Sequence, residues 1–276
     1  MNEEERNRIL EERKKWYALI PVQFEIIKNL HHRELCFLSQ KEELIKHPVR
    51  YLIAFNISYL NKHFERFDFL DNLINMYNSC AILRDVPVFS YNLKLRKEAD
   101  EYKEFNENYD KYVTSYDFFL DIDGKEDFEL AFSEAKEIKK ILEEYHLPFF
   151  CLNSSFNGFH FVVPSMYLPT MEINKLLKIL EKVMINIKGI YDFKTLDTSI
   201  VDLKRVRKVP YSYECSGAIC LPLSDFMLDN FKKENVTMSN VLRTITIKNR
   251  GNLVRNLDLG EEQLKENVKK FLLDFQ

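Results

Sequence analysis

The chain has 276 residues, 46% hydrophobic and 13% aromatic, which suffices for one large domain or for two small units that share a core. Its net charge of −3 excludes a uniformly basic nucleic-acid-binding protein, although basic residues gather in the last third and leave room for a local basic face. With 6 glycines, 8 prolines and no Gly/Ser-rich linker, we expect one unit over residues 1–276. Within it, an N-terminal α/β part would cover about residues 1–110 and a palm-like part about 111–276.

Neither a membrane span nor a cysteine-based metal site is expected. No apolar run approaches the roughly 20 residues that cross a bilayer, and residues 1–15 lack the apolar core of a signal peptide. We therefore expect a cytoplasmic protein without a membrane partner, nucleoid-associated if its source is prokaryotic. The five cysteines are odd in number and form no CxxC pair, which predicts reduced thiols and no zinc or iron–sulfur site. They are Cys36, Cys80, Cys151, Cys215 and Cys220.

The first third of the chain alternates helix-like and strand-like segments. Residues 1–15 form a charged, helix-like stretch, and residues 50–55 and 76–83 are strand candidates. Residues 94–110 are charged and expected to be exposed.

The remainder predicts an α/β (α+β) fold with an antiparallel component. We expect strands at 118–123, 149–152, 159–163 and 218–221, and helices at 126–145, at 171–187 and from about 260 onward. The order strand, helix, strand, strand, helix is similar to that of a ferredoxin-like palm.

Two carboxylates end the apolar strand at 118–123. Asp121 and Asp123 are two residues apart, so in a strand they project from the same face. Two such carboxylates repel one another unless a cation lies between them, and Mg²⁺ or Mn²⁺ suits an all-oxygen site. The alternative is a strand that merely finishes in a polar turn at Asp123 and Gly124.

A turn-forming cluster, residues 154–160, opens onto the strand at 159–163. The hydroxyls of Ser154 and Ser155, the Asn157 amide and the backbone near Gly158 suit the binding of a phosphate, and His160 could contact a triphosphate oxygen. The alternative is a hairpin turn followed by a core histidine bonded to a carbonyl.

A third carboxylate, Asp197, precedes a basic segment, residues 204–208, and Ser212. These residues suit a metal ligand followed by a triphosphate clamp, or only a solvated, charge-capped helix end.

Taken in order, these motifs resemble the archaeo-eukaryotic primase superfamily, and in particular the catalytic small subunit of archaeal and eukaryotic DNA primases. The family signatures are Asp-x-Asp after an apolar strand, Ser…Gly-x-His, and Asp followed by Arg/Lys…Pro-x-Ser. Here they read as residues 120–123, 154–160, and 196–197 with 208–212. Residues 217–223 are similar to the family's Gly-x-Ile-x-Val-Pro strand, and residues 32–37 to its N-terminal Arg-Glu-Phe segment.

The resemblance implies a primase-type catalytic core, with a ferredoxin/RRM-like palm packed against an N-terminal α/β unit. It implies template-directed nucleotidyl transfer, with primers made or extended on single-stranded DNA from NTPs or dNTPs. A two-metal Mg²⁺ or Mn²⁺ site would be held by Asp121, Asp123 and Asp197. The nucleotide would be held by Ser154, Ser155, Asn157, Gly158, His160, Arg205, Lys208 and Ser212. A primase large subunit or another replication protein is the further partner expected.

The chain also departs from the family pattern. Many relatives carry basic residues where Phe156 and Asn157 stand, and a histidine where Tyr213 and Glu214 follow the Pro-x-Ser motif. The helical insertion and the zinc module of many small subunits are missing, as in a minimal catalytic core. A primer-extending repair or mobile-element polymerase, a non-catalytic nucleic-acid-binding relative and a metal-dependent phosphohydrolase therefore stay open as alternatives.

Overall fold

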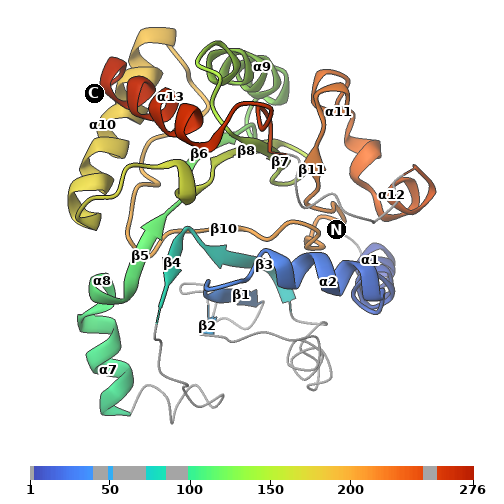
Figure 1. Ribbon diagram of the computed structural model, residues 1–276. Coiled ribbons are helices and arrows are strands. Elements are labelled where there is room, and N and C mark those ends of the chain that lie inside the picture. The colour runs from blue at the N-terminus through green and yellow to red at the C-terminus, as the bar shows by residue number, and fades with distance from the viewer. Residues whose placement is uncertain (1–2, 40–48, 52–72, 85–98, 245–253) are drawn as a thin grey trace.

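Two antiparallel sheets, one below the other in Figure 1, organise this computed structural model, which describes residues 3–39, 49–51, 73–84, 99–244 and 254–276. The upper, palm sheet has the order β11-β7-β8-β6-β9 and the lower, N-terminal sheet the order β10-β3-β1-β2. Within the described residues, no helix has both the length and the apolar character needed to cross a membrane. All five cysteines are free thiols, four of them buried.

The palm sheet has the connectivity of a ferredoxin-like unit. Its strands are β6 (Phe118–Asp123), β7 (Phe150–Asn153), β8 (Gly158–Val163), β9 (Leu196–Asp197) and β11 (Pro222–Leu223). The chain runs β6, α9 (Phe128–Glu144), β7, β8, α10 (Ile173–Tyr191), β9, and the strands lie in the order β7-β8-β6-β9. The predicted palm and its antiparallel sheet are therefore confirmed.

Helices cover one face of the palm sheet and leave the other to the site. α9, α10 and α13 (Glu261–Asp274) lie above it in Figure 1. Residue alternation explains this: Phe118 contacts Phe271 of α13, at 6.2 Å between ring centroids, so Leu120 and Ile122 share that face while Asp121 and Asp123 point away from it. The apolar helical spacing within residues 126–145 and 171–187 correctly predicted α9 and α10, each with boundaries shifted by a few residues.

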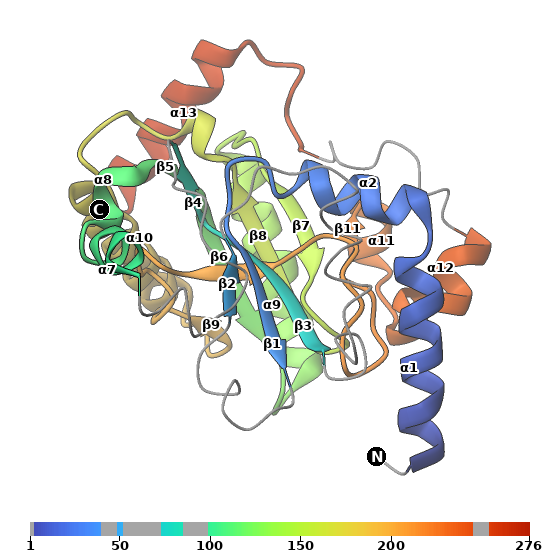
Figure 2. The same cartoon turned by 90° about the horizontal axis from the view of Figure 1, so that it is seen from below.

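The N-terminal sheet is completed by a strand from much later in the chain. Its strands are β1 (Leu35–Ser39), β2 (Val49–Tyr51), β3 (Leu73–Ser79) and β10 (Val206–Lys208). β10 follows the palm strand β9 in sequence but pairs with β3, so the chain crosses from one sheet to the other between residues 198 and 205. Helices α1 (Glu3–Tyr17) and α2 (Ile20–Lys28) lie beside this sheet (Figure 2).

A small two-stranded sheet links the two layers. β4 (Ala81–Leu83) pairs with β5 (Val113–Tyr116), and α7 (Asp100–Glu107) and α8 (Tyr109–Tyr112) precede β5. Strand is therefore confirmed over residues 76–83 except at Cys80, where the predicted single strand divides into β3 and β4 with different partners. Residues 94–98 lie outside the described residues, as do 52–55 of the strand predicted at 50–55. From residue 99 on, the segment expected to be exposed is helical and buries Phe105 and Tyr109.

The C-terminal region covers the far edge of the palm sheet with short elements. They are α11 (Asp225–Asp229), η2 (Lys233–Val236) and α12 (Met238–Thr244). The short helix η1 (Ser165–Tyr167) instead follows β8 and contacts β5 and α13. The strand predicted at 218–221 is replaced by isolated bridges of Ala218 and Ile219, because the Ile219 amide donates to Val236 whereas the Ala218 carbonyl accepts from Glu214. The regular strand follows at β11.

The N-terminal helix α1 supports the segment that follows β10. The Trp16 indole Nε1 donates to the Tyr211 carbonyl at 2.8 Å, and the Tyr17 hydroxyl accepts from the Tyr213 amide at 2.8 Å. Tyr211 has φ of 68°, a left-handed conformation that costs a tyrosine energy. These bonds therefore hold the segment in an otherwise unfavourable conformation.

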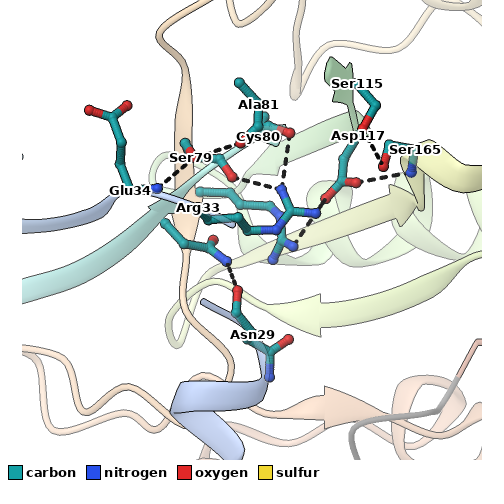
Figure 3. A network of polar contacts seen from close by, with 11 residues as sticks. Asn29, Arg33, Glu34, Ser79, Cys80, Ala81, Ser115, Asp117 and Ser165 are labelled. Atoms are coloured by element: carbon teal, nitrogen blue, oxygen red, sulfur yellow. Dashed lines mark hydrogen bonds and ion pairs between the residues drawn. The ribbon is translucent and has the colours of Figure 1, made fainter. Parts of the chain in front are cut away.

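A buried carboxylate joins the two sheets. Asp117, just before β6, accepts from Arg33 at 2.8 Å and from the Ser165 amide at 3.0 Å (Figure 3). It also accepts from Arg207 of β10 at 3.2 Å. Arg33 also donates to the Ser79 carbonyl at the end of β3, at 2.8 Å. One side chain of the palm unit thereby fixes β3 and β10 of the other sheet.

Candidate active site

A cavity of about 340 Å³ lies between the two sheets. The palm strands β6 and β8 supply one wall, and β3 and β10 supply the other. Its lining residues are Asn75, Tyr77, Phe119, Asp121, Asp123, Lys125, Ser154, Ser155, His160, Arg205, Val206, Arg207, Lys208 and Glu214. Seven of the predicted site residues are in this set.

Three predicted site residues form a row across the palm sheet. Asp121 on β6 is the register partner of His160 on β8 and also of Asp197 on β9. Partners on adjacent antiparallel strands project from the same face with Cα atoms about 5 Å apart. The sheet therefore brings together side chains that are distant in sequence, and Asp123 follows on the same face of β6.

Asp121 is the charged centre of this row. His160 Nε2 lies 3.4 Å from Oδ1, and the Arg205 guanidinium lies 3.7 Å from Oδ2. Burial alone would raise the pKa of Asp121, but His160 and Arg205 outweigh burial and hold the pKa below its usual range. Asp121 is therefore an anion at neutral pH, although only 19% of its side chain is exposed.

The other two carboxylates also have partners within the chain. Lys125 Nζ lies 2.8 Å from Asp123 Oδ2, and the Lys125 amide donates to Oδ1 at 3.1 Å. Arg205 lies 3.8 Å from Asp197 Oδ2, while the Ser199 amide and hydroxyl donate to its Oδ1 at 2.9 and 2.7 Å. Asp197 lies in the row but does not line the cavity.

The donor chemistry of these side chains suits a hard divalent cation. Asp121, Asp123 and Asp197 offer carboxylate oxygens alone, the ligands that Mg²⁺ and Mn²⁺ prefer. In the side-chain arrangement of the described residues, however, no three His, Cys, Asp or Glu groups converge as a metal site. The positive charge there comes from Arg205 and Lys125, and both are partly exposed and long enough to turn away.

The turn before β8 is tightly built. The Ser154 amide donates to the Gly158 carbonyl at 2.8 Å, and the Asn157 amide donates to Ser155 Oγ at 3.1 Å. A Cβ on Gly158 would lie 2.4 Å from Ser154 Oγ, so only glycine fits. Ser154 and Ser155 line the cavity, whereas Asn157 and Gly158 shape the turn behind them.

The basic segment is held differently from what the sequence predicted. The Lys208 side chain is 12% exposed and pairs with the buried carboxylate of Glu214, and this carboxylate raises the pKa of Lys208 against the opposing effect of partial burial. Ser212 is fully buried outside the cavity lining, and its Oγ has no hydrogen-bond partner among the described residues. Of the predicted clamp, Arg205 and Lys208 reach the cavity.

Several cavity residues were not predicted as site residues. Asn75 and Tyr77 on β3 form the opposite wall, where Asn75 Nδ2 donates to the Tyr77 hydroxyl at 3.1 Å. Lys208 Nζ lies 5.2 Å from the centroid of the Tyr77 ring. Asn75 and Tyr77 are neutral residues on an apolar strand and carry no sequence signal of a site. Arg207, in contrast, belongs to the basic segment, and that segment could have indicated it as a site residue.

The ferredoxin-like palm, its carboxylate-bearing first strand and a second sheet across a cavity form a fold that is also found in a polymerase domain of known structure. Among solved structures, the chain is similar to the polymerase domain of Ligase D from Mycobacterium tuberculosis in complex with DNA. The TM-score is 0.52 at 11% identity, over 85% of this chain and 89% of that one. It also matches the AEP domain of the primase-polymerase (PrimPol) of cyanophage S-2L, with a TM-score of 0.40 at 12% identity, over 78% and 90%.

The first of these similarities establishes the fold, whereas the TM-score of the second, 0.40, is too low to support an argument. No protein-family model and no curated protein matches the sequence. The predicted fold class, a primase-type α/β core, is confirmed at this level. The resemblance to the small subunit of DNA primase in particular stays a prediction.

Proposed function

We propose that this protein is a template-directed nucleotidyltransferase, a DNA primase or primase-polymerase that makes or extends short primers. One observation carries the proposal: Asp197, Asp121 and His160 form a row across β9, β6 and β8, and Asp123 follows on β6 in the lining of the cavity. A row of this kind places anionic oxygens next to a group that can bind phosphate.

The carboxylates and the serines of the site then have separate roles. Asp121, Asp123 and Asp197 would hold two divalent ions, Mg²⁺ or Mn²⁺, which would lower the pKa of a primer 3′-hydroxyl and neutralise charge on pyrophosphate. Ser154 and Ser155 would donate to phosphate oxygens, with their turn kept in shape by Asn157 and Gly158.

The cationic side chains and the imidazole complete the site. His160 would donate to a phosphate oxygen from Nε2, and Phe119 packs edge-on against its ring at 4.7 Å between centroids. Arg205 would exchange its contact with the carboxylates for the nucleotide, since it lies at the long distances of 3.7 and 3.8 Å from them. Lys208 would supply positive charge nearby. Single-stranded DNA would be the template and NTPs or dNTPs the substrates.

Extension without initiation is a narrower form of the same proposal. The structural neighbour is described as a polymerase domain in complex with DNA, which fits extension of a strand as well as its initiation. A large subunit or another replication protein would be a further partner.

A gel assay tests the proposal. The protein is incubated with Mg²⁺ or Mn²⁺ and either nucleotide set, on unprimed single-stranded DNA and on a primed template. Products on unprimed DNA identify a primase, products on primed DNA alone identify an extending polymerase, and absence of products from both contradicts the proposal.

A non-catalytic nucleic-acid-binding role is the second candidate, because the chain's own Arg205 and Lys125 neutralise the carboxylates. It requires that nucleotide binding be independent of divalent metal. Titration of dNTP with and without Mn²⁺ distinguishes the two, since an enhancement by Mn²⁺ favours catalysis.

A further inference from the structure

Cationic side chains line the cavity, and most of them have a carboxylate of their own. In the part of the chain that the structure describes, the lysines and arginines of the lining are Lys125, Arg205, Arg207 and Lys208. Lys125 pairs with Asp123, and Lys208 pairs with Glu214. Arg205 lies between two carboxylates. Only Arg207 remains to be matched.

Arg207 has to share its carboxylate. Its Nη2 lies 3.2 Å from Asp117 Oδ2, and Arg33 Nη2 lies 2.8 Å from the same oxygen. Asp117 is the sole carboxylate that either arginine contacts among the described residues. Two guanidinium groups and one carboxylate therefore leave one positive charge without a carboxylate partner among the described residues.

This charge is concentrated on Arg207. It is 3% exposed, and its Nε and Nη1 are buried without a hydrogen-bond partner among the described residues. Arg33, in contrast, also donates to the carbonyls of Ser79 and Cys80, at 2.8 and 3.0 Å. A buried cation with unused donors is costly to a folded protein. Such a group is expected where a ligand supplies the missing anion.

We propose that Arg207 is the phosphate anchor of the cavity, and that it donates to the polyphosphate of the nucleotide from Nε and Nη1, which lack a hydrogen-bond partner within the described residues. This inference rests on the proposed function and assigns the anchoring role to a residue other than the predicted Arg205 and Lys208. A guanidinium suits the task because it keeps its positive charge and carries five N–H donors, so it can bind a phosphate while Nη2 stays on Asp117. The Phe150 ring, 5.5 Å from Arg207 Cζ, and Asp117 hold the guanidinium in place.

Two matched variants test the proposal. Arg207→Met and Arg33→Met each remove one arginine and leave the other paired with Asp117, but only Arg207 lines the cavity. Inorganic tripolyphosphate is titrated into each protein by calorimetry without divalent metal, with sulfate as the control anion. We expect Arg207→Met to weaken tripolyphosphate binding by about tenfold or more, and Arg33→Met by less than about threefold.

Thermal unfolding supplies an independent readout. Without ligand, Arg207→Met should unfold at a temperature no lower than the wild type, because it removes an unmatched buried cation. Tripolyphosphate should raise the unfolding temperature of the wild type and of Arg33→Met, but not of Arg207→Met. Should Arg207→Met not fold, Arg207→Lys is tested in the same way, because it keeps the positive charge but loses the guanidinium donors. Tripolyphosphate should then bind Arg207→Lys more weakly than the wild type.

The outcomes that overturn the inference are distinct. They are absence of tripolyphosphate binding by the wild type, equal binding of sulfate, and equal losses in the two variants. Failure of the proposed function would look different. If the wild type binds tripolyphosphate through Arg207 but never extends DNA, the anchoring role stands and the polymerase activity is refuted. If the protein extends DNA and Arg207→Met has the same KM for nucleotide as the wild type, the polymerase activity stands and the anchoring role is refuted.

Discussion

Asp121 lies directly opposite Asp197 across the β6–β9 pair, and one guanidinium, that of Arg205, lies within 4 Å of both carboxylates. Two anions held this close need a cation between them. In the free protein Arg205 supplies that charge, and in the proposed reaction a divalent ion would replace it. The same carboxylates would thus be stabilised in both states, by different cations.

Removal of one carboxylate should abolish activity without unfolding the protein. Asp123→Asn keeps the side-chain volume but removes an anionic metal ligand, so we expect primer extension to fall by at least about 100-fold. Because 44% of the Asp123 side chain is exposed, its pairing with Lys125 contributes little to stability. Steady-state extension rates and thermal unfolding check the two expectations.

Asp192→Asn is the matched control for this substitution. Asp192 is an exposed carboxylate at the end of α10 with φ of 55°, a conformation that asparagine tolerates well. We expect its extension rate to equal that of the wild type. Wild-type rates in Asp123→Asn as well would rule out the metal assignment.

Truncation of the histidine should act on nucleotide binding. His160→Ala removes a donor 3.4 Å from Asp121, and we expect the KM for nucleotide to rise by about tenfold with kcat changed by less than about threefold. A fall in kcat at constant KM would instead show that His160 serves only to orient Asp121. Initial rates over a nucleotide concentration series separate these cases.

Two glycines should respond in opposite directions to the same substitution. A Cβ on Gly158 would lie 2.4 Å from Ser154 Oγ and 2.8 Å from the Ile122 carbonyl, so Gly158→Ala should destabilise the protein by about 1 to 3 kcal/mol. Gly189, on the exposed side of α10, has no atom within 4 Å of such a Cβ. Gly189→Ala should therefore stabilise the helix by about 0.5 to 1 kcal/mol. Urea denaturation measures both, and a gain for Gly158→Ala would contradict the tight turn.

The buried Asp117 should make stability depend on acid pH. Arg33 and Arg207 outweigh burial and lower the pKa of Asp117 below the ordinary value of 3.8. A lowered pKa stabilises the folded state above the pKa of the unfolded chain, and the contribution is lost as the pH falls through the folded-state pKa. At about pH 6, Asp117→Asn should thus cost about 3 to 5 kcal/mol, because it leaves two buried cations unpaired.

The difference in the free energy of unfolding between the wild type and Asp117→Asn should shrink as the pH drops below 3.8, because protonation makes the wild-type Asp117 side chain neutral too. Denaturant unfolding over this pH range measures it. The exposed Asp100, paired with Lys103 on α7, gives the control, because Asp100→Asn should show little difference at any pH. If the free energy of unfolding of Asp117→Asn differs from that of the wild type by the same amount down to acid pH, Asp117 is not the titrating group.

The order of elements in the palm could be predicted because each carries a local pattern. The alternation around Asp121, the helical spacing of residues 126–145 and the turn before His160 depend on neighbours in sequence. The row of Asp197, Asp121 and His160 was implied only through the family resemblance, since strand register is a property of the folded sheet.

What could not be predicted depends on contacts between the sheets. Lys208 and Glu214 are close in sequence, yet their burial follows from β10 joining β3, a pairing that no local pattern indicates. In the sequence, Asp117 is only a polar residue before an apolar strand. Its role in connecting the two sheets follows from its ion pairs with Arg33 and Arg207. In the sequence, Tyr77 is an ordinary strand residue, and only the folded structure places it in the cavity wall opposite the palm sheet.

The crossing of the chain into β10 has a consequence for cutting the protein into pieces. A fragment that ends near residue 110 would keep β3 but lose its β10 partner, and would present an unpaired strand edge to other molecules. A fragment that begins there would carry Arg207 with neither β3 nor Arg33 beside Asp117. The two halves are therefore expected to aggregate when expressed apart and to recover a common structure only when produced together.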